Sequence, residues 1–209
     1  GGYFEHGVIL GTQLIHFGAL GRFGGGRERS FGYALVRLGA DINVKGSPLN
    51  SAGFGMSLGG GGTGPDSICE DQKCKPEHER GVLRNNIIVN CPADVGIYIN
   101  AGKDSKILNN TLFNTAGIDM RFAETTGVVS NNLLNGKIRD RDGAVTSKMN
   151  NLAEVSLADF GAWFNDPGAY DFTLKDGAQI VDLGAALPEV TDDYCANARD
   201  DGMPDIGAV

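Results

Sequence analysis

The chain has 209 residues, a net charge of −8, 32 glycines, four cysteines and a single tryptophan. The negative balance argues against a nucleic-acid-binding protein, which would normally carry a basic patch or stripe, although a local arginine cluster could still bind a polyanion. No apolar run reaches the roughly 18 residues of a membrane span, so no spanning helix is predicted.

The first 60 residues contain short apolar runs separated by glycine and proline. The runs at 8–10, 14–17, 33–36 and 54–58 each fit a short strand. Their spacing of roughly 20 residues is close to that of the repeat that follows. We therefore predict that this region forms less regular coils of one solenoid.

Residues 59–80 form one long polar insertion, rich in glycine, proline and charge. Long loops inside compact domains are often functional. Cys69 and Cys74 lie close together in this insertion, which favours a small local disulfide. Cys91 lies among the repeats and is expected to be a buried free thiol, while the pairing of Cys195 stays open.

The same insertion carries three acidic residues, Asp66, Glu70 and Asp71. Carboxylate oxygens in a flexible loop are the ligands that Ca²⁺ prefers. Ca²⁺ is therefore the cofactor we favour for this chain, ahead of zinc, for which His78 is the only further ligand near the two cysteines. The alternative is a solvated acidic loop in a protein without any cofactor.

A pair of adjacent asparagines recurs along the middle of the chain. The pairs begin 24, 22 and 19 residues apart, at Asn85, Asn109, Asn131 and Asn150. A period of about 20–25 residues predicts a solenoid, in which each coil buries its apolar face on the next. One asparagine of each pair is expected at a bend, in left-handed backbone. Side-chain amides stacked from coil to coil could also bond in a ladder.

Short alternating segments in residues 81–143 predict strands between these bends. The apolar members of the alternation should face inward, and the residues between them should face out. The predicted inward residues are Ile97, Ile99, Ile118, Met120 and Ile138.

The region after the repeats has a different pattern. Residues 156–164 resemble a capped helix with aromatic residues at helical spacing, and 165–168 should end it. The tail, 165–209, is rich in aspartate, with short strands expected at 172–174 and 180–181. A solenoid end needs a cap, and we expect this tail to provide it.

The asparagine phrases and the tail together resemble the right-handed parallel β-helix repeat proteins, a family of secreted polysaccharide lyases, hydrolases, epimerases and uncharacterised extracellular proteins. The tail residues that carry the resemblance are Asp166-Pro167, Asp171-Phe172-Thr173-Leu174, Val181-Asp182-Leu183-Gly184 and Pro204-Asp205-Ile206-Gly207-Ala208-Val209. The resemblance implies an all-β fold: a single right-handed parallel β-helix domain over 1–209, with one short helix and a loop-rich C-terminal cap.

The resemblance also implies a secreted or cell-surface protein whose partner is an acidic polysaccharide rather than a nucleic acid. About six or seven coils are expected here, fewer than in typical enzymes of this fold. The chain begins at Gly1 without a starting methionine or signal peptide, so we expect a processed product or one part of a longer protein. A second chain or upstream coils would then complete the solenoid.

Aligning the strands that begin near Ile97, Ile118 and Ile138 stacks their outward residues in rows about 4.8 Å apart. One row holds Tyr98, Asp119 and Arg139, and the next holds Asn100, Arg121 and Arg141. Ser57, and beyond it His16, are expected to extend the first row.

A face with three arginines predicts a uronate-binding groove, because guanidinium groups pair carboxylates bidentately. By resemblance, the reaction would be β-elimination. Arg121 or Arg139 would neutralise the carboxylate, and Tyr98 or His16 would serve as base or acid. The substrate-binding residues would be Asp119, Asn100, Arg141 and Ser57.

Three alternatives remain open. The rows are equally typical of a surface ion-pair cluster. Hydrolysis would need a carboxylate pair, for which Asp140 and Asp142 are candidates in a charged turn. The protein would otherwise be non-catalytic, either binding carbohydrate or stacking through exposed coil ends.

Overall fold

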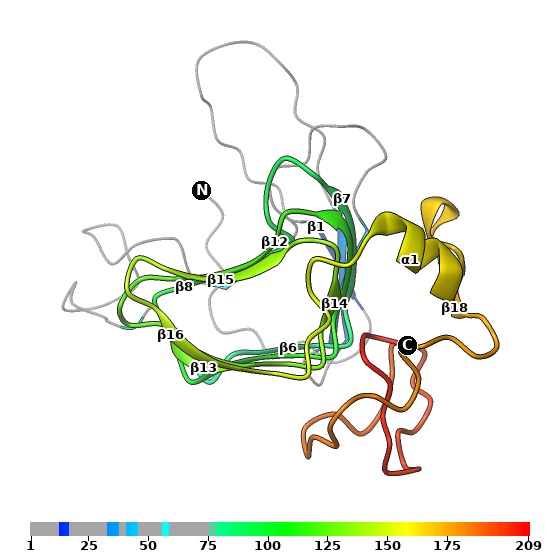
Figure 1. Ribbon diagram of the computed structural model, residues 1–209. Coiled ribbons are helices and arrows are strands. Elements are labelled where there is room, and N and C mark those ends of the chain that lie inside the picture. Colours follow the sequence, from blue (N-terminus) through cyan, green and yellow to red (C-terminus); the bar gives the residue numbers. More distant parts are fainter. Residues whose placement is uncertain (1–12, 17–32, 38–40, 46–55, 59–75, 77) are drawn as a thin grey trace.

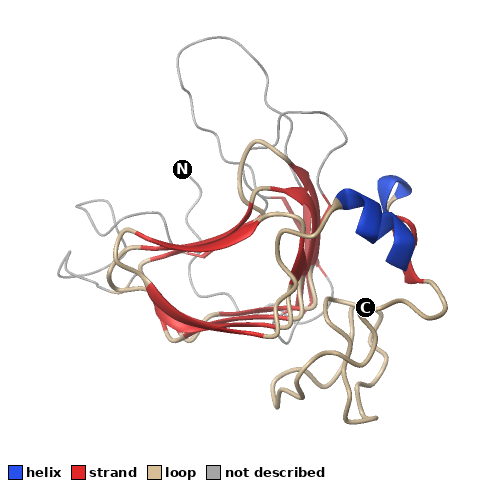
Figure 2. Ribbon diagram, in the orientation of Figure 1, coloured by secondary structure: helices blue, strands red, loops and turns tan. Residues whose placement is uncertain are grey.

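A computed structural model describes residues 13–16, 33–37, 41–45, 56–58, 76 and 78–209. Most strands in this part of the chain belong to parallel sheets that wind into a β-solenoid, with one α-helix beside it (Figures 1 and 2). The prediction of an all-β parallel β-helix is therefore confirmed. The extent of the single domain over 1–209 stays a prediction.

Three sheets form the walls of the solenoid, and Figure 1 looks along its axis. The parallel strands of the first wall are β6 (Val82–Arg84), β10 (Ser105–Leu108), β13 (Thr126–Ser130) and β16 (Val145–Met149). The second wall contains β7 (Ile87–Cys91), β11 (Thr111–Thr115) and β14 (Leu133–Leu134). The third contains β4 (Met56–Leu58), β8 (Ile97–Asn100), β12 (Gly117–Arg121) and β15 (Lys137–Arg141).

The solenoid makes about three turns, so the expectation of six or seven coils is wrong. The N-terminal strands do not add parallel coils. Instead β1 (Gln13–His16), β2 (Tyr33–Arg37) and β3 (Asp41–Lys45) pair antiparallel in chain order and extend the first wall. Each of these strands lies directly beside the one before it in the chain, which antiparallel pairing allows and a coil does not.

Two further short strands lie outside the walls. They are β5 (His78–Glu79) and β9 (Gly102–Lys103), which pair in parallel. The predicted metal ligands Asp66, Glu70 and Asp71 and the predicted Cys69–Cys74 disulfide lie outside the described residues. Among the described cysteines, Cys91 is a buried free thiol as predicted, and Cys195 is free and exposed.

The interior is apolar and stacked in register. Ile97, Ile99, Ile118 and Met120 are fully buried, and Ile138 packs partly buried against the same cluster. All five predicted inward residues are thus confirmed. Burial of such side chains stabilises by about 1.5–3 kcal/mol each, which makes this core the main source of stability for the coils.

The two asparagines of each pair have different places. The first adopts left-handed backbone, with φ of 54° at Asn85, 48° at Asn109, 56° at Asn131 and 49° at Asn150. The second points inward and forms the expected ladder of amides, whose members are Asn86, Asn110, Asn132 and Asn151. Both predictions for the pairs are confirmed.

The predicted helix is α1 (Leu157–Trp163), whose N-terminus is capped by the Ser156 side chain. It ends at β17 (Phe164–Asp166), a short 3-10 turn over Pro167–Ala169 follows, and β18 (Asp171–Leu174) then pairs antiparallel with β17. The strand expected at 180–181 is absent from this described segment, because the Val181 amide bonds back to Ala178 in a turn.

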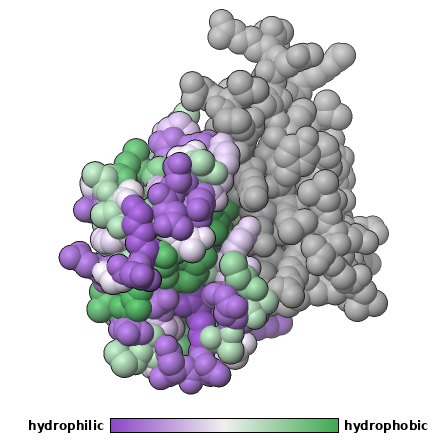
Figure 3. Space-filling model, turned by 90° about the vertical axis from the view of Figure 1, so that its right-hand side faces the viewer, coloured by the Kyte–Doolittle hydropathy of each residue, from purple (hydrophilic) through white to green (hydrophobic). Residues whose placement is uncertain are grey.

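The tail packs along the side of the solenoid rather than over its end (Figure 1). Its buried Phe160, Phe164 and Ile206 form a second core with Ile87 and Leu133 of the second wall. The expectation of an end cap is therefore wrong. The outer face of the second wall carries apolar side chains, such as Ile87, Val89 and Leu133. The tail therefore shields this face from water, and not the coil end. Figure 3 faces this side, where hydrophilic and hydrophobic residues are mixed.

The C-terminal coil end is closed instead by a polar group. In register, Asp140 follows Met120 and Lys148 follows Val129 at inward positions. Lys148 Nζ lies 2.5 Å from Asp140 Oδ2, and the two side chains are 33% and 24% exposed. Inward charges on edge strands disfavour pairing with another chain.

Candidate functional site

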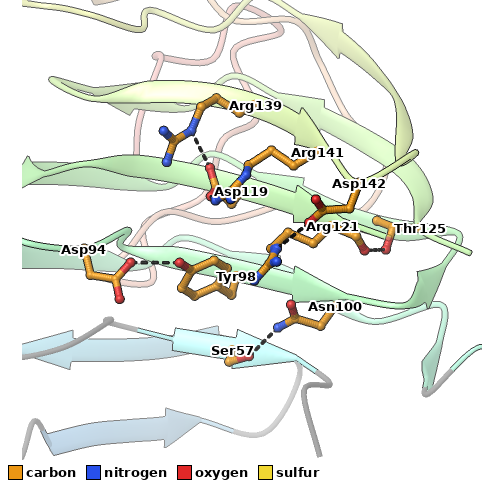
Figure 4. A network of polar contacts seen from close by, with 10 residues as sticks. All are labelled: Ser57, Asp94, Tyr98, Asn100, Asp119, Arg121, Thr125, Arg139, Arg141 and Asp142. Atoms are coloured by element: carbon orange, nitrogen blue, oxygen red, sulfur yellow. Dashed lines mark hydrogen bonds and ion pairs between the residues drawn. The ribbon is translucent and has the colours of Figure 1, made fainter. Parts of the chain in front are cut away.

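The predicted rows lie side by side on the outer face of the third wall (Figure 4). The register pairs Ser57 with Tyr98, Tyr98 with Asp119, and Asp119 with Arg139. The neighbouring row of Asn100, Arg121 and Arg141 is likewise in register. Both predicted rows, including the extension to Ser57, are confirmed as geometry.

His16 does not belong to this face. It lies in β1, where its backbone pairs with that of Tyr33 at the edge of the first wall. The expected extension of the row to His16 is therefore wrong. The N-terminal strands form an antiparallel meander, so they do not return to the third wall once per coil.

A glycine allows the close approach of strands that carries the site. Gly117 begins β12 with φ of 113°, and a Cβ there would lie 2.0 Å from the carbonyl oxygen of Lys137. Only glycine accepts both the left-handed φ and this contact. The backbones of β12 and β15 therefore stay in register, with Asp119 directly beside Arg139.

Asp119 is the centre of the face. Arg139 Nε lies 2.6 Å from its Oδ1, and Arg141 Nη1 lies 2.6 Å from its Oδ2. The carboxylate is fully covered, whereas each arginine side chain is 42% exposed. Asp119 was predicted to bind substrate, but two guanidinium groups separate it from solvent. Within this group of three side chains, two cations against one carboxylate leave one net positive charge.

Arg121 is held from three directions. Its Nε donates to Asp142 Oδ2 at 2.8 Å. Its guanidinium carbon lies 4.8 Å from the ring centre of Phe122 and 6.0 Å from that of Tyr98. Arginine over an aromatic face is stabilised by the ring quadrupole, so this side chain is oriented before any ligand arrives.

Tyr98 is a hydrogen-bond donor here. Its hydroxyl donates to Asp94 Oδ1 at 2.9 Å. Burial and this bond to a carboxylate both raise the pKa of Tyr98 above its usual value. The bond to Asp119 raises the pKa of Arg141 as well. Both groups therefore hold their protons at neutral pH, which is the wrong state for a general base.

The edge of the face toward β4 is polar and uncharged. Asn100 Nδ2 donates to Ser57 Oγ at 3.1 Å. Asn100 is buried, whereas Ser57 is exposed. Ser57 and Asn100 therefore give this end of the face uncharged polar groups, while the three arginines lie on β12 and β15.

Asp140 and Asp142, the two carboxylates considered for hydrolysis, bond to different partners in different places. Asp140 bonds to Lys148 and Thr146 at the coil end, and Asp142 bonds to Arg121 on the outer face. A hydrolase needs two carboxyl groups that converge on one bond, and these two do not. In the part of the chain that the structure describes, no group of three or more His, Cys, Asp or Glu side chains could hold a metal ion.

An open hollow of about 390 Å³ lies beside the face at the C-terminal coil end. Its lining includes Lys137 and Arg139 from the face and Lys148 and Glu154 from the end of the coil. Positive side chains thus continue from the face onto the end of the solenoid.

Two residues of the site, Asp94 and Phe122, were missed by sequence reasoning, and Asp142 was considered only as a hydrolytic carboxylate and not as the partner of Arg121. Asp94 and Asp142 lie just outside the strands, and only the coil corners bring them back to Tyr98 and Arg121. Phe122 directly follows Arg121 in the sequence. This arginine–phenylalanine pair at the end of a predicted strand was the one signal that the sequence offered for it.

Comparison with known proteins finds no relative of this chain. No family model matches the chain, and no curated protein or solved structure is significantly similar to it. Among the described residues, none of the helices is long and apolar enough to cross a membrane. The function therefore has to be argued from the face itself.

Proposed function

We propose that the protein binds an acidic polysaccharide through the outer face of the third wall, without cleaving it. The observation that carries this proposal is the pair of arginines on Asp119. One edge of each guanidinium is anchored on a buried carboxylate, and each side chain is 42% exposed. The remaining N–H donors suit a carboxylate of the ligand.

Anchoring lowers the cost of binding. A free arginine loses rotamer freedom when it takes a ligand, at about 0.5–1.5 kcal/mol per side chain. Arg139 and Arg141 have already lost that freedom to Asp119. The group of Arg139, Arg141 and Asp119 keeps one net positive charge, which favours an anionic group of the glycan over a neutral one at this point of the face, in a chain whose total charge is −8.

β-Elimination has weaker support than binding. It needs a base that is deprotonated at neutral pH, and the pKa values of Tyr98 and Arg141 are both raised. Arg139 and Arg121 are each bonded to a carboxylate. Self-stacking also has weaker support, because Asp140 and Lys148 place charge on the exposed C-terminal coil end, where a further coil would have to pack.

A secreted or cell-surface location fits this proposal, since that is where acidic polysaccharides of cell walls and matrices occur. Ca²⁺ bound by the insertion at Asp66, Glu70 and Asp71 remains part of the proposal. It would be read as a change in affinity on adding Ca²⁺ or a chelator.

The test is binding of alginate, pectate, chondroitin, ulvan and neutral dextran, measured by calorimetry. We expect binding to at least one acidic chain and none to dextran. Arg139→Gln and Arg141→Gln should each weaken binding about tenfold or more, as loss of a charge-assisted bond predicts. Lys103→Gln is the matched control, because Lys103 is 52% exposed in β9, outside the third wall.

Two outcomes would overturn the proposal. If no acidic polysaccharide binds to the wild-type protein, the face is a structural ion-pair cluster. If incubation produces the ultraviolet absorbance of an unsaturated uronate, the protein is a lyase and the non-cleaving part of the proposal fails.

A further inference from the structure

Phe122 occupies an unusual place for an aromatic residue. It follows β12 at the corner of the second coil, with φ of 74° and 38% of its surface exposed. Left-handed backbone is rare for a bulky residue and marks either strain or a function. The corner is therefore costly for a phenylalanine.

The equivalent corners show that the turn itself does not need an aromatic. Asn100, Arg121 and Arg141 are in register, so the residues after them occupy the same corner. These are Ala101, with φ of 47°, and Asp142, with φ of 56°. The corner forms with alanine and with aspartate, so the ring of Phe122 serves something other than the turn.

The ring is part of an ordered ledge. The guanidinium of Arg121 lies 4.8 Å from its centre, and the Nε of the same guanidinium donates to Asp142 Oδ2 at 2.8 Å. An aromatic face is electron-rich and attracts polarised C–H bonds as well as cations. The ledge thus combines an apolar surface with hydrogen-bond donors. A sugar ring complements both, because one side of it carries C–H groups and its hydroxyl groups accept hydrogen bonds.

We infer that Phe122 and Arg121 form a sugar-stacking subsite at the edge of the polysaccharide-binding face. The subsite would take a pyranose ring through its apolar C–H side, and Arg121 would donate to the ring's hydroxyl groups. This inference rests on the proposed function. It adds a ligand class: an acidic chain in which a uronate lies next to a sugar with an unsubstituted C–H face.

The position of the ledge supports this pairing. Arg121 is in register with Arg141, on the adjacent strand, and Arg141 bonds to Asp119. Neighbouring strands lie about 4.8 Å apart. A sugar stacked on Phe122 would therefore sit beside the arginine pair, and the next sugar along the chain could place its carboxylate there.

The test is Phe122→Asn, measured by calorimetry with the acidic polysaccharide that the wild-type protein binds best. Asparagine accepts left-handed backbone well, so the variant should unfold at the same temperature as wild type or higher. Binding should nevertheless weaken about tenfold, as loss of an aromatic contact predicts. Phe122→Trp should bind at least as well as wild type, and Phe122→Leu should behave like Phe122→Asn.

The salt dependence separates this subsite from the arginine pair. Phe122→Asn should leave the slope of affinity against salt unchanged, whereas Arg141→Gln should reduce it. If Phe122→Asn binds like wild type while Arg141→Gln still loses affinity, the stacking subsite is wrong and the proposed function stands. If the wild-type protein binds no acidic polysaccharide, both are wrong.

Discussion

Asn110 Nδ2 lies 2.9 Å from Asn132 Oδ1, and the Asn110 main-chain amide donates to the same oxygen at 3.0 Å. The contact repeats between Asn132 and Asn151 at 2.9 Å. Each amide therefore bonds both to its neighbour and to the backbone. Chains of such bonds in a low-dielectric interior strengthen one another, so the ladder holds successive coils in register.

Replacing Asn132 by leucine should destabilise the protein by about 2–4 kcal/mol, because several buried partners lose their bonds. Those partners are the carbonyls of Ile107 and Ser130 and the side chains of Asn110 and Asn151. Chemical denaturation measures the change. Asn150→Gly is the control, since Asn150 is exposed and glycine suits its φ of 49°. A leucine variant as stable as this control would show that the ladder contributes nothing.

The first asparagine of the pair holds the tail. Asn131 Nδ2 donates to the Ala185 carbonyl at 2.8 Å, and the Ala185 amide donates to Asn131 Oδ1 at 3.0 Å. Asn131→Gly keeps the left-handed corner and removes both bonds. We expect faster hydrogen exchange and faster proteolysis in residues 178–209, with the coils unchanged. Equal protection of the tail in wild type and variant would contradict this role.

The solenoid could be predicted because its signal is local and repeated. Asparagine tolerates the corner backbone, and isoleucine alternation marks the inner face, so the asparagine pairs and Ile97, Ile118 and Ile138 specify the coils. The strands before residue 50 carry no such signal. The strand β3 at 41–45 was not predicted, and alternation alone cannot distinguish a parallel coil from an antiparallel meander.

The candidate site was predicted in part for the same reason. Register follows from the repeat, so Tyr98, Asp119 and Arg139 could be aligned. Burial depends on side chains from the next coil, so the covering of Asp119 by Arg139 and Arg141 could not be foreseen. The position of the tail was missed because the second wall has apolar residues on both faces, such as Ile87 and Ile88, and alternation does not reveal this.

Asp140 makes the coil end sensitive to acid. Burial acts to raise the pKa of Asp140, but bonds from Lys148 and Thr146 outweigh it, so the pKa is lowered. A carboxyl group whose pKa is lower in the folded than in the unfolded protein stabilises the fold at any pH above its unfolded pKa of about 3.9. This stabilisation is lost as the pH falls through the pKa of the folded state.

Asp140→Asn should therefore lower stability at pH 7 by about 0.5–1 kcal/mol, the range for a solvent-screened pair. The difference should shrink below about pH 4 and vanish at lower pH. Thermal unfolding across pH measures it. A difference that grows in acid would show that the ion pair has the opposite effect.

The two described cysteines should differ in reactivity. Burial, with a smaller effect of Asp94, raises the pKa of Cys91 to about 11, whereas Cys195 is exposed. The thiolate is the reactive form, so maleimide should label Cys91 at least about 100-fold more slowly than Cys195 in the folded protein. Peptide mapping by mass spectrometry reads each site. The same map without reductant tests the predicted Cys69–Cys74 disulfide, and equal labelling of Cys91 and Cys195 would contradict the buried core.

The proposed binding of a polyanionic glycan depends on Arg139 and Arg141, which are anchored on Asp119. The most direct test is the affinity for one acidic polysaccharide over a range of salt concentrations, in wild type, Arg141→Lys and Arg141→Gln. Binding should weaken as salt rises, and the slope should fall in Arg141→Gln as one ionic contact is lost. Arg141→Lys should keep the slope but bind more weakly, because lysine lacks the bidentate fork. An affinity independent of salt, or identical in all three proteins, would contradict the claim.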